Sequence, residues 1–277
     1  GCGHGGLFLR GRHYPADQVM RTLYHHFYLA WTTLTALPLP ALGGSKPDEA
    51  AYRKAAGLFP LVGALIGLLL YAIGHVLLIM AMPTPFSGIT IVLIYYLITG
   101  FLHFDGLCDV CDALFANTDA PRRLTILKDS RLGTYALTIG VLALIAKVAL
   151  VNRLMLVPHG ITLLVIVPVW SRLAMVLLAA WGRYPRQEGT GKPFIGRITV
   201  QDAALTAGCA LIIIFAVAWL FRLGPLLIGL QALIVASVTI AMYTWSNHKI
   251  GGVTGDVLGA AGEIGDLFLL GGSLALL

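Results

Sequence analysis

Residues 57–82 read GLFPLVGALIGLLLYAIGHVLLIMAM and contain no Asp, Glu, Lys or Arg. A helix that crosses the hydrocarbon core of a bilayer needs about 20 apolar residues, so this run predicts a transmembrane helix. Gly57, Gly63 and Gly67 give the helix small faces, which favour close packing against a neighbouring helix.

Comparable apolar runs recur along the chain, so we predict an all-α, polytopic integral membrane protein with about six to eight transmembrane helices. The predicted spans are residues 57–82, 86–103, 134–157, 160–182, 203–221 and 225–245, with a seventh at 264–277. The run 22–42 is interrupted by Pro38 and Pro40, and it either lies in the interface, re-enters, or spans as a bent helix. Composition excludes an ordinary soluble enzyme, because 12% of the residues are charged, against about 25% in soluble domains.

The polar connections and short turns alternate, which assigns each to a side of the membrane. The long connections are residues 43–56, 104–133, 183–202 and 246–263, and they carry most of the Lys and Arg behind the net charge of +6. By the positive-inside rule they face the cytoplasm, as in a bacterial inner-membrane protein. The basic excess therefore indicates topology and contact with membrane lipids, not nucleic-acid binding. An oligomer is compatible with the sequence but not required by it. Residues 1–20 are expected to be an extension or cloning remnant.

Residues 99–112 read TGFLHFDGLCDVCD and hold the most informative polar pattern. Asp105, Asp109 and Asp112 are spaced i, i+4, i+7, so on a helix they share an arc of about 60°. Three carboxylates on one face repel each other, and a divalent cation such as Mg²⁺ or Mn²⁺ removes that penalty. A solvated acidic helix end is the alternative. His103 is a candidate general base or metal ligand, or a hydrogen-bonded helix-end histidine.

A second acidic set lies in GGVTGDVLGAAGE at 251–263. Asp256 and Glu263 share a face if this segment is helical. The glycines before Asp256, among them Gly252, permit close approach of the backbone to a phosphate, although a flexible connection fits equally well. Asp129, in KDSRLG at 128–133, is either another carboxylate of the site or half of a surface ion pair.

Four basic residues are expected on the same side as these acids: Lys128, Arg131, Lys192 and Arg197. Cations around a metal site suit phosphoryl transfer, because they neutralise substrate oxygens; singly, each is equally a topology or headgroup-binding charge. Lys147 and Arg172 fall inside predicted spans, where charge normally faces a polar partner. No acidic residue is predicted at mid-membrane, so no coupled ion path is expected. Cys108 and Cys111 have no second CxxC pair, which disfavours a redox or zinc site.

From about residue 27 onward the chain resembles the cobalamin 5′-phosphate synthases, also called adenosylcobinamide-GDP ribazoletransferases. The shared stretches are LPLP at 37–40, FPLVG at 59–63, residues 99–112, ILKDSRLG at 126–133, EGxG at 188–191, FIG at 194–196 and GGVTGDVLG at 251–259. The chain departs from the family pattern at four positions: Phe101 and Ala113 replace Gly, and Cys108 and Cys111 replace Ala. Every carboxylate is retained, so the departures concern local packing.

The resemblance implies the last assembly step of the nucleotide loop of vitamin B12. Adenosylcobinamide-GDP reacts with α-ribazole or its 5′-phosphate, giving adenosylcobalamin or its 5′-phosphate plus GMP. Residues 21–277 then form a single polytopic membrane catalytic domain. The implied cofactor is Mg²⁺, held by Asp105, Asp109, Asp112 and Asp256. The implied substrate- and phosphate-binding residues are Lys128, Arg131, Lys192, Arg197, Glu188, Gly252 and Thr254. The candidates for accepting the hydroxyl proton are Asp112, Asp129 and His103.

Two other classes of function stay open. A CDP-alcohol phosphotransferase or an aromatic prenyltransferase also places Asp-rich motifs at helix ends, although the Ala-Arg pair expected in the former after its Asp-Gly start is absent here. A transporter or channel would favour polar groups at mid-span and paired interrupted helices, whereas the polar groups here cluster on one side.

Overall fold

The computed structural model describes residues 16–41 and 47–277, and all regular secondary structure in this part of the chain is helical. The elements are α1 (Ala16–Leu34), α2 (Glu49–Ala56), α3 (Phe59–Ile79), α4 (Thr84–Thr99), α5 (Leu102–Phe115), α6 (Ala120–Ile126), α7 (Thr134–Met155), η1 (Gly160–Thr162), α8 (Leu163–Trp181), α9 (Val200–Leu220), α10 (Pro225–Ile250) and α11 (Gly255–Leu274). The predicted extension at 1–20 lies mostly outside the described residues, and residues 16–20 belong to α1.

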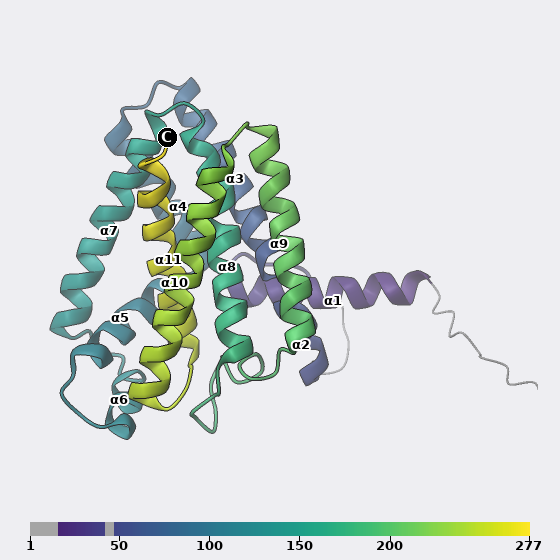
Figure 1. The fold of residues 1–277 in the computed structure, drawn as a ribbon, viewed down its shortest axis with the longest axis vertical. Coiled ribbons are helices and arrows are strands. Elements are labelled where there is room, and N and C mark those ends of the chain that lie inside the picture. Colours follow the sequence, from purple (N-terminus) through teal and green to yellow (C-terminus); the bar gives the residue numbers. More distant parts are fainter. Residues whose placement is uncertain (1–15, 42–46) are drawn as a thin grey trace, which may run out of the picture.

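Within the described ranges, six helical segments are long and apolar enough to cross a membrane: α3, α7, η1 with α8, α9, α10 and α11. The pair α4 and α5 adds a seventh if it is counted as one span bent by 90°. The prediction of an all-α, polytopic membrane protein is therefore confirmed. The short turns α3–α4, α7–α8 and α9–α10 lie at one end of the bundle with the C-terminus (Figure 1). The opposite end, formed by α5, α6 and residues 182–199 and 251–254, is called the long-loop end below.

Helix α8 lies at the centre of the bundle, with 94% of its most apolar stretch buried. It packs against α3, α9, α10 and α11. Helix α3 approaches it closely, because a Cβ atom at Gly63 or Gly67 would lie only 2.4 or 2.5 Å from backbone oxygens of α8. The predicted close packing is confirmed at these two glycines, whereas Gly57 precedes α3 and ends α2.

The chain turns sharply between α4 and α5, where Gly100 and Phe101 have left-handed φ angles of 60° and 58°. The predicted span 86–103 is therefore wrong at its end, since α4 stops at Thr99 and α5 departs at 90°. The predicted connection 104–133 is also partly helical, because it contains most of α5 and all of α6. Arg123 of α6 is buried and donates to carbonyl oxygens at the end of α5, which holds the two helices together.

The connection predicted at 246–263 is wrong. Helix α10 continues to Ile250, and only residues 251–254 separate it from α11. Asp256 and Glu263 lower the hydropathy at the start of this helix, so a span defined by the apolar run alone begins too late, at residue 264, just before Asp266. Because the three acids share one helix, Asp256 lies at the long-loop end while Glu263 and Asp266 lie inside the bundle.

Helix α1 lies across the bundle instead of along it (Figure 1), and it packs on α2 and α3. Leu29, Ala30 and Leu34 are buried, whereas Met20 and Leu23 nearer its start are exposed. The helix is not among the candidate spans. The sequence left open whether this segment lies in the membrane interface, re-enters the membrane or spans it as a bent helix. The observed arrangement favours a position in the interface.

Candidate active site

Helix α5 carries Asp105, Asp109 and Asp112, so the helix that their spacing assumed is present. Asp105 is exposed, and the other two are half-buried. Helix α5 lies directly on the first turn of α11: a Cβ atom at Gly106 would be 2.8 Å from the carbonyl oxygen of Asp256, so the contact requires glycine. The Asp109 carboxylate is consequently repelled by Asp105, Asp256 and Asp112, and it is attracted by Arg186.

Asp112 connects α5 to α7. Its carboxylate accepts hydrogen bonds from the backbone N–H groups of Gly133 at 2.8 Å and Ala136 at 3.0 Å. These donors lie at the N-terminus of α7, where the N-cap residue Gly133 has no side chain to cap the helix. The predicted roles of Asp112 as metal ligand and catalytic carboxylate stay predictions, because each of its oxygens keeps a second lone pair.

Asp256 lies in the first turn of α11, where the helix dipole favours a negative charge. Thr254 caps this helix by accepting from the Val257 N–H at 3.4 Å, and its hydroxyl donates to the Asp256 carboxylate at 3.1 Å. Nη1 of Arg186, from the α8–α9 connection, pairs with the same carboxylate at 3.2 Å. The predicted Gly-rich loop thus builds the start of α11, with Gly252 packed against the Arg183 carbonyl. Its contact with a phosphate stays a prediction.

A cavity of about 390 Å³ opens in the α8–α9 connection, next to the Arg186–Asp256 pair. It is lined by Arg183, Arg186, Lys192 and Arg197, with Gly182, Tyr184, Ile195 and Gly196. Lys192 and Arg197 were predicted as phosphate-binding residues, and the structure brings them to one cavity. Arg183 and Arg186 were missed, because in the sequence they count only as topology charges. Their place in RYPR at 183–186, shortly before the EGTG motif, was the available signal.

Several contacts fix the cavity walls. Arg197 pairs with Glu49 of α2 at 2.9 Å, and Nζ of Lys192 donates to the Gln187 carbonyl at 2.5 Å. The Tyr184 hydroxyl donates to the backbone carbonyl of Glu188 at 3.1 Å. Burial raises the pKa of Tyr184, which keeps its hydroxyl neutral. The Glu188 side chain itself is exposed, and its predicted substrate contact stays a prediction.

The α6–α7 connection holds Lys128, Asp129 and Arg131. Asp129 and Arg131 form a surface ion pair, with Nη2···Oδ2 of 2.7 Å. The hydrogen bonds from Arg131 lower the pKa of Asp129 to about 2. Lys128 is exposed and lies within 4.0 Å of no carboxylate in the described ranges. Of the two alternatives for Asp129, the structure therefore favours the surface ion pair.

His103 is buried, and it lies on the opposite side of α5 from the three aspartates. The charges that act on it are those of Arg172, Asp266 and Lys147, inside the bundle. It therefore does not join the aspartates in one cluster. In residues 16–41 and 47–277, no three His, Cys, Asp or Glu side chains come close enough together to hold a metal ion. The four predicted metal ligands adjoin one another but do not converge on one point.

Comparison of the sequence with known proteins assigns the chain to a family. A family model described as cobalamin-5-phosphate synthase matches residues 26–274. The chain belongs to that family. Three relatives named adenosylcobinamide-GDP ribazoletransferase are 36% identical over 252 residues (Klebsiella pneumoniae subsp. pneumoniae), 35% over 246 (Escherichia coli strain K12 / DH10B) and 32% over 248 (Geotalea daltonii). Each alignment covers 88% of this chain, and 97%, 97% and 94% of the respective relative. No solved structure matches.

Four of the stretches that carry the resemblance meet at the long-loop end. Residues 99–112 contact residues 251–259 through Gly106 and Asp256, and residues 126–133 through Asp112 and Gly133. Residues 188–191 reach the start of α11, where a Cβ at Gly191 would lie 2.9 Å from the Gly255 nitrogen. Stretches far apart in the sequence thus build one region.

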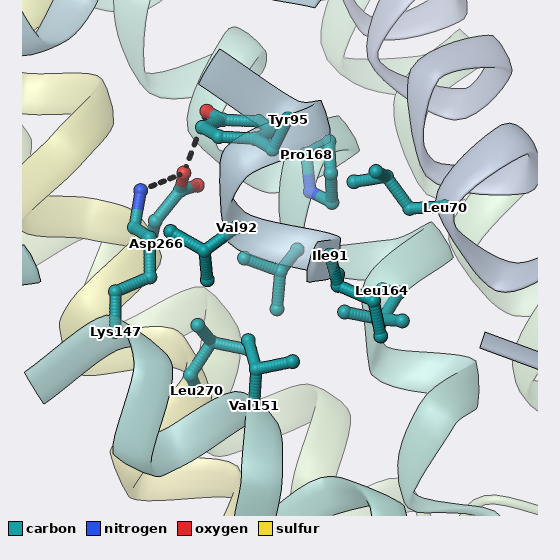
Figure 2. A pocket seen from close by; sticks show the side chains of 11 residues that line it. Leu70, Ile91, Val92, Tyr95, Lys147, Val151, Leu164, Pro168, Asp266 and Leu270 are labelled. Atoms are coloured by element: carbon teal, nitrogen blue, oxygen red, sulfur yellow. Dashed lines mark hydrogen bonds and ion pairs between the residues drawn. The ribbon is translucent and has the colours of Figure 1, made fainter. Parts of the chain in front are cut away.

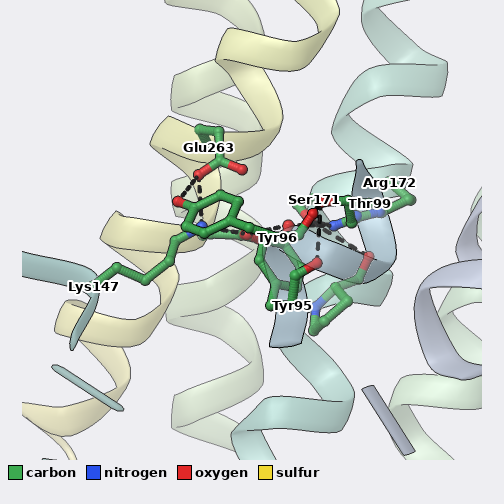
Figure 3. Close-up of polar contacts among 9 residues, drawn as sticks. Tyr95, Tyr96, Thr99, Lys147, Ser171, Arg172 and Glu263 are labelled. Atoms are coloured by element: carbon green, nitrogen blue, oxygen red, sulfur yellow. Dashed lines mark hydrogen bonds and ion pairs between the residues drawn. The ribbon is translucent and has the colours of Figure 1, made fainter. Parts of the chain in front are cut away.

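A second polar cluster, the buried network, lies inside the bundle. Nζ of Lys147 in α7 pairs with Oε2 of Glu263 at 2.6 Å and with Oδ2 of Asp266 at 3.1 Å. Tyr95 donates to Asp266 at 2.8 Å (Figure 2), and Tyr96 donates to Glu263 at 2.9 Å (Figure 3). The prediction that no acid lies at mid-membrane is therefore wrong. Glu263 lies inside the bundle because α11 begins earlier than the apolar run indicated, and Asp266 already fell within the predicted span 264–277.

Arg172 of α8 completes the buried network. It is fully buried and donates to the Tyr95 hydroxyl at 3.1 Å and to Oγ of Ser171 at 3.0 Å. The network thus joins α4, α7, α8 and α11. Lys147 and Asp266 also border a cavity of only about 30 Å³ whose remaining walls are mostly apolar (Figure 2). This space is far too small for a nucleotide.

Proposed function

We propose that this chain catalyses the adenosylcobinamide-GDP ribazoletransferase reaction, the activity named for its relatives. The observation that carries the proposal is the arrangement at the long-loop end. There the carboxylates of Asp105, Asp109 and Asp256 adjoin a cavity lined by four cations, and the Arg186–Asp256 pair joins the two. Phosphoryl transfer needs both parts, since cations neutralise substrate oxygens and carboxylates hold a metal ion.

In this reaction a ribose hydroxyl of α-ribazole, or of its 5′-phosphate, attacks the phosphorus bonded to the corrinoid side chain. A new P–O bond forms, the P–O–P bridge breaks, and GMP leaves with the bridging oxygen. The hydroxyl proton passes to a base. Asp129 suits this role poorly, because its pKa is about 2, and His103 lies on the other side of α5. A carboxylate of α5 therefore takes the proton.

The chemistry of the donor set fits magnesium. Asp105 and Asp109 are one helical turn apart on α5, and Asp256 lies near them on α11. These are hard oxygen donors of the kind that Mg²⁺ prefers, although in this structure the three do not converge on one point. Without a cation these carboxylates would repel the diphosphate. Bound Mg²⁺ would polarise the phosphoryl oxygens and offset the charge of the departing GMP. Asp109, between its two neighbours, is the residue whose loss should matter most.

The long-loop end faces the cytoplasm of a bacterial inner membrane in this proposal. The supporting observation is that the cavity with its four cations lies at this end, in agreement with the positive-inside rule. Relatives of this chain occur in Escherichia coli and Klebsiella pneumoniae. Contact with lipids follows from the exposed apolar side chains of the spans.

The direct test is release of GMP. Purified protein in detergent is given adenosylcobinamide-GDP and Mg²⁺, and GMP is measured by chromatography with and without α-ribazole or its phosphate. GMP should appear only with an acceptor, and excess EDTA should abolish it while added Mg²⁺ restores it. Turnover of a CDP-alcohol in place of the corrinoid substrate would instead support the phosphotransferase alternative.

Asp109→Asn tests the carboxylates. It should lower kcat by roughly 100-fold or more, because one metal ligand and its charge are lost, while the elution profile in detergent stays that of the wild type. Asp119→Asn is the matched control: Asp119 caps α6 at the same end of the bundle, and Asn caps helices equally well. Equal activity of the two variants would remove Asp109 from the site.

A further inference from the structure

The cavity in the α8–α9 connection holds cations that lack partners. Arg183 and Lys192 lie within 4.0 Å of no carboxylate in the described part of the chain, whereas Arg186 pairs with Asp256 and Arg197 with Glu49. The charges of Arg183 and Lys192 are therefore not offset by a carboxylate, and an anion in the cavity would offset them. The cavity is therefore electrostatically suited to an anionic group.

Arg186 gives the second observation. Its side chain is only 11% exposed, and it uses Nη1 for Asp256. Its buried Nε and Nη2 atoms have no partner with full hydrogen-bond geometry among the described residues, although the Tyr184 hydroxyl lies near the guanidinium. Leaving buried donors unpaired costs about 1–3 kcal/mol each, so an acceptor is expected beside them. A guanidinium with two free donors matches the paired oxygens of a phosphate.

The cavity is also held in place before any ligand binds. The Arg183 carbonyl accepts from the Val253 N–H at 2.8 Å, which ties the cavity wall to the connection before α11. A Cβ at Gly182 would lie 2.7 Å from the Val253 side chain, so the two connections pack closely. An anion that reaches Arg186 would thus lie next to Asp256 and the carboxylates of α5.

We infer that this cavity is a phosphate-binding subsite, with Arg183, Arg186 and Lys192 as its donors. The inference rests on the proposed function for the identity of the ligand. That reaction offers two sources of the same chemistry: the diphosphate of the GDP-activated donor, and the 5′-phosphate of a phosphorylated acceptor. Both present several anionic oxygens to the cations, and kinetics with the two acceptors separates them.

Lys192→Gln and Arg183→Gln are the variants of choice, because Arg186 also holds Asp256. The kcat and KM values are measured for the donor, for α-ribazole and for α-ribazole 5′-phosphate, with Arg122→Gln, an exposed cation on α6, as control. A loss of kcat/KM of about tenfold or more with the phosphorylated acceptor only assigns the subsite to the acceptor. An equal loss with both acceptors and a raised KM for the donor assigns it to the diphosphate. A change below twofold, or a lower kcat with every KM unchanged, overturns the inference.

Binding of pyrophosphate separates this inference from the proposed function. The probe is inorganic pyrophosphate with excess EDTA, which removes any metal site, and the readout is the thermal unfolding midpoint of the purified protein. Pyrophosphate should raise the midpoint of the wild type and of Arg122→Gln, and raise it less in Lys192→Gln. Such a shift without GMP release would sustain the subsite and defeat the proposed function. GMP release without any shift of the wild-type midpoint would support the proposed function and overturn the subsite.

Discussion

The two polar regions of this bundle differ in how their charges are paired. In the buried network two cations, Lys147 and Arg172, stand with two carboxylates, and Lys147 contacts both acids directly. At the long-loop end, four cations line one cavity and, among the described residues, only two of them contact a carboxylate. The charges of the buried network balance one another without a ligand. At the long-loop end, in contrast, charges of both signs stay available to bind a ligand.

This difference indicates different roles. Burying an ion costs several kcal/mol, which only close opposite charges and hydrogen bonds offset. The buried network balances its charges across three helices, which favours one packing of α7, α8 and α11. Its hydrogen bonding is less complete, because Nε and Nη2 of Arg172, Oε1 of Glu263 and Oδ1 of Asp266 have no partner among the described residues. It also fixes α11, whose first turn carries Asp256. The open region is instead exposed enough to exchange water for a ligand, as a binding site must be.

Lys147→Met should have the largest effect on stability. It leaves Glu263 and Asp266 buried with only Arg172 nearby, and removal of one partner from a buried pair costs about 3–5 kcal/mol. The expected result is aggregation or a much lower unfolding midpoint in detergent, measured by size-exclusion chromatography and thermal denaturation.

The double variant Lys147→Met/Glu263→Gln sharpens this result. It removes one charge of each sign and leaves Arg172 with Asp266, so no net charge stays buried. It should be more stable than Lys147→Met alone, because the uncompensated carboxylate is gone. A double variant less stable than the single one would mean that packing, and not charge balance, governs this region.

Asp112→Asn tests whether Asp112 mainly anchors α7 or mainly binds a metal ion. The carboxylate accepts two backbone N–H groups of α7, and an amide offers only one oxygen. Losing one charge-assisted bond should cost about 1–2 kcal/mol of stability. If anchoring is its main role, the unfolding midpoint falls and the Mg²⁺ concentration for half-maximal activity is unchanged. An unchanged midpoint with a large rise in that concentration would make Asp112 a metal ligand.

Much of the fold was predictable, because a continuous apolar run is stable as a helix across a bilayer whichever helices lie beside it. The errors fall where polar residues enter a span. Glu263 and Asp266 lie in a membrane-length helix where Lys147 of α7 and Arg172 of α8 together balance their charges, and this pairing is a tertiary contact. Hydropathy flagged Lys147 as needing a partner, but no local pattern indicates which helix supplies it.

The carboxylates of the candidate site were predictable from their spacing, since i, i+4, i+7 fixes a face before any packing is known. The cavity was not. Arg183 and Arg186 follow a span directly, where cations are common for reasons of topology. Only the folded connection shows that Arg186 turns back to Asp256 and leaves two buried donors. The low pKa of Asp129 could not be predicted either, because it depends on how the Arg131 side chain is oriented in the fold.

The smallest predicted effect concerns Phe101, which links the two regions. It separates α4, which carries Tyr95 and Tyr96 of the buried network, from α5 with its aspartates, and its ring stacks on Tyr96 with centroids 5.4 Å apart. At φ of 58°, a residue with a Cβ costs about 1 kcal/mol relative to glycine. Phe101→Gly and Phe101→Ala both lose the ring, so their difference isolates the backbone.

Phe101→Gly should therefore be more stable than Phe101→Ala by about 1 kcal/mol, which thermal denaturation of both variants in detergent measures. Leu114, in the helical part of α5, provides the control pair. There the order should reverse, with Ala above Gly by about 1 kcal/mol, because an ordinary helical position penalises glycine. The same order at both positions would show that the turn at Phe101 is unstrained.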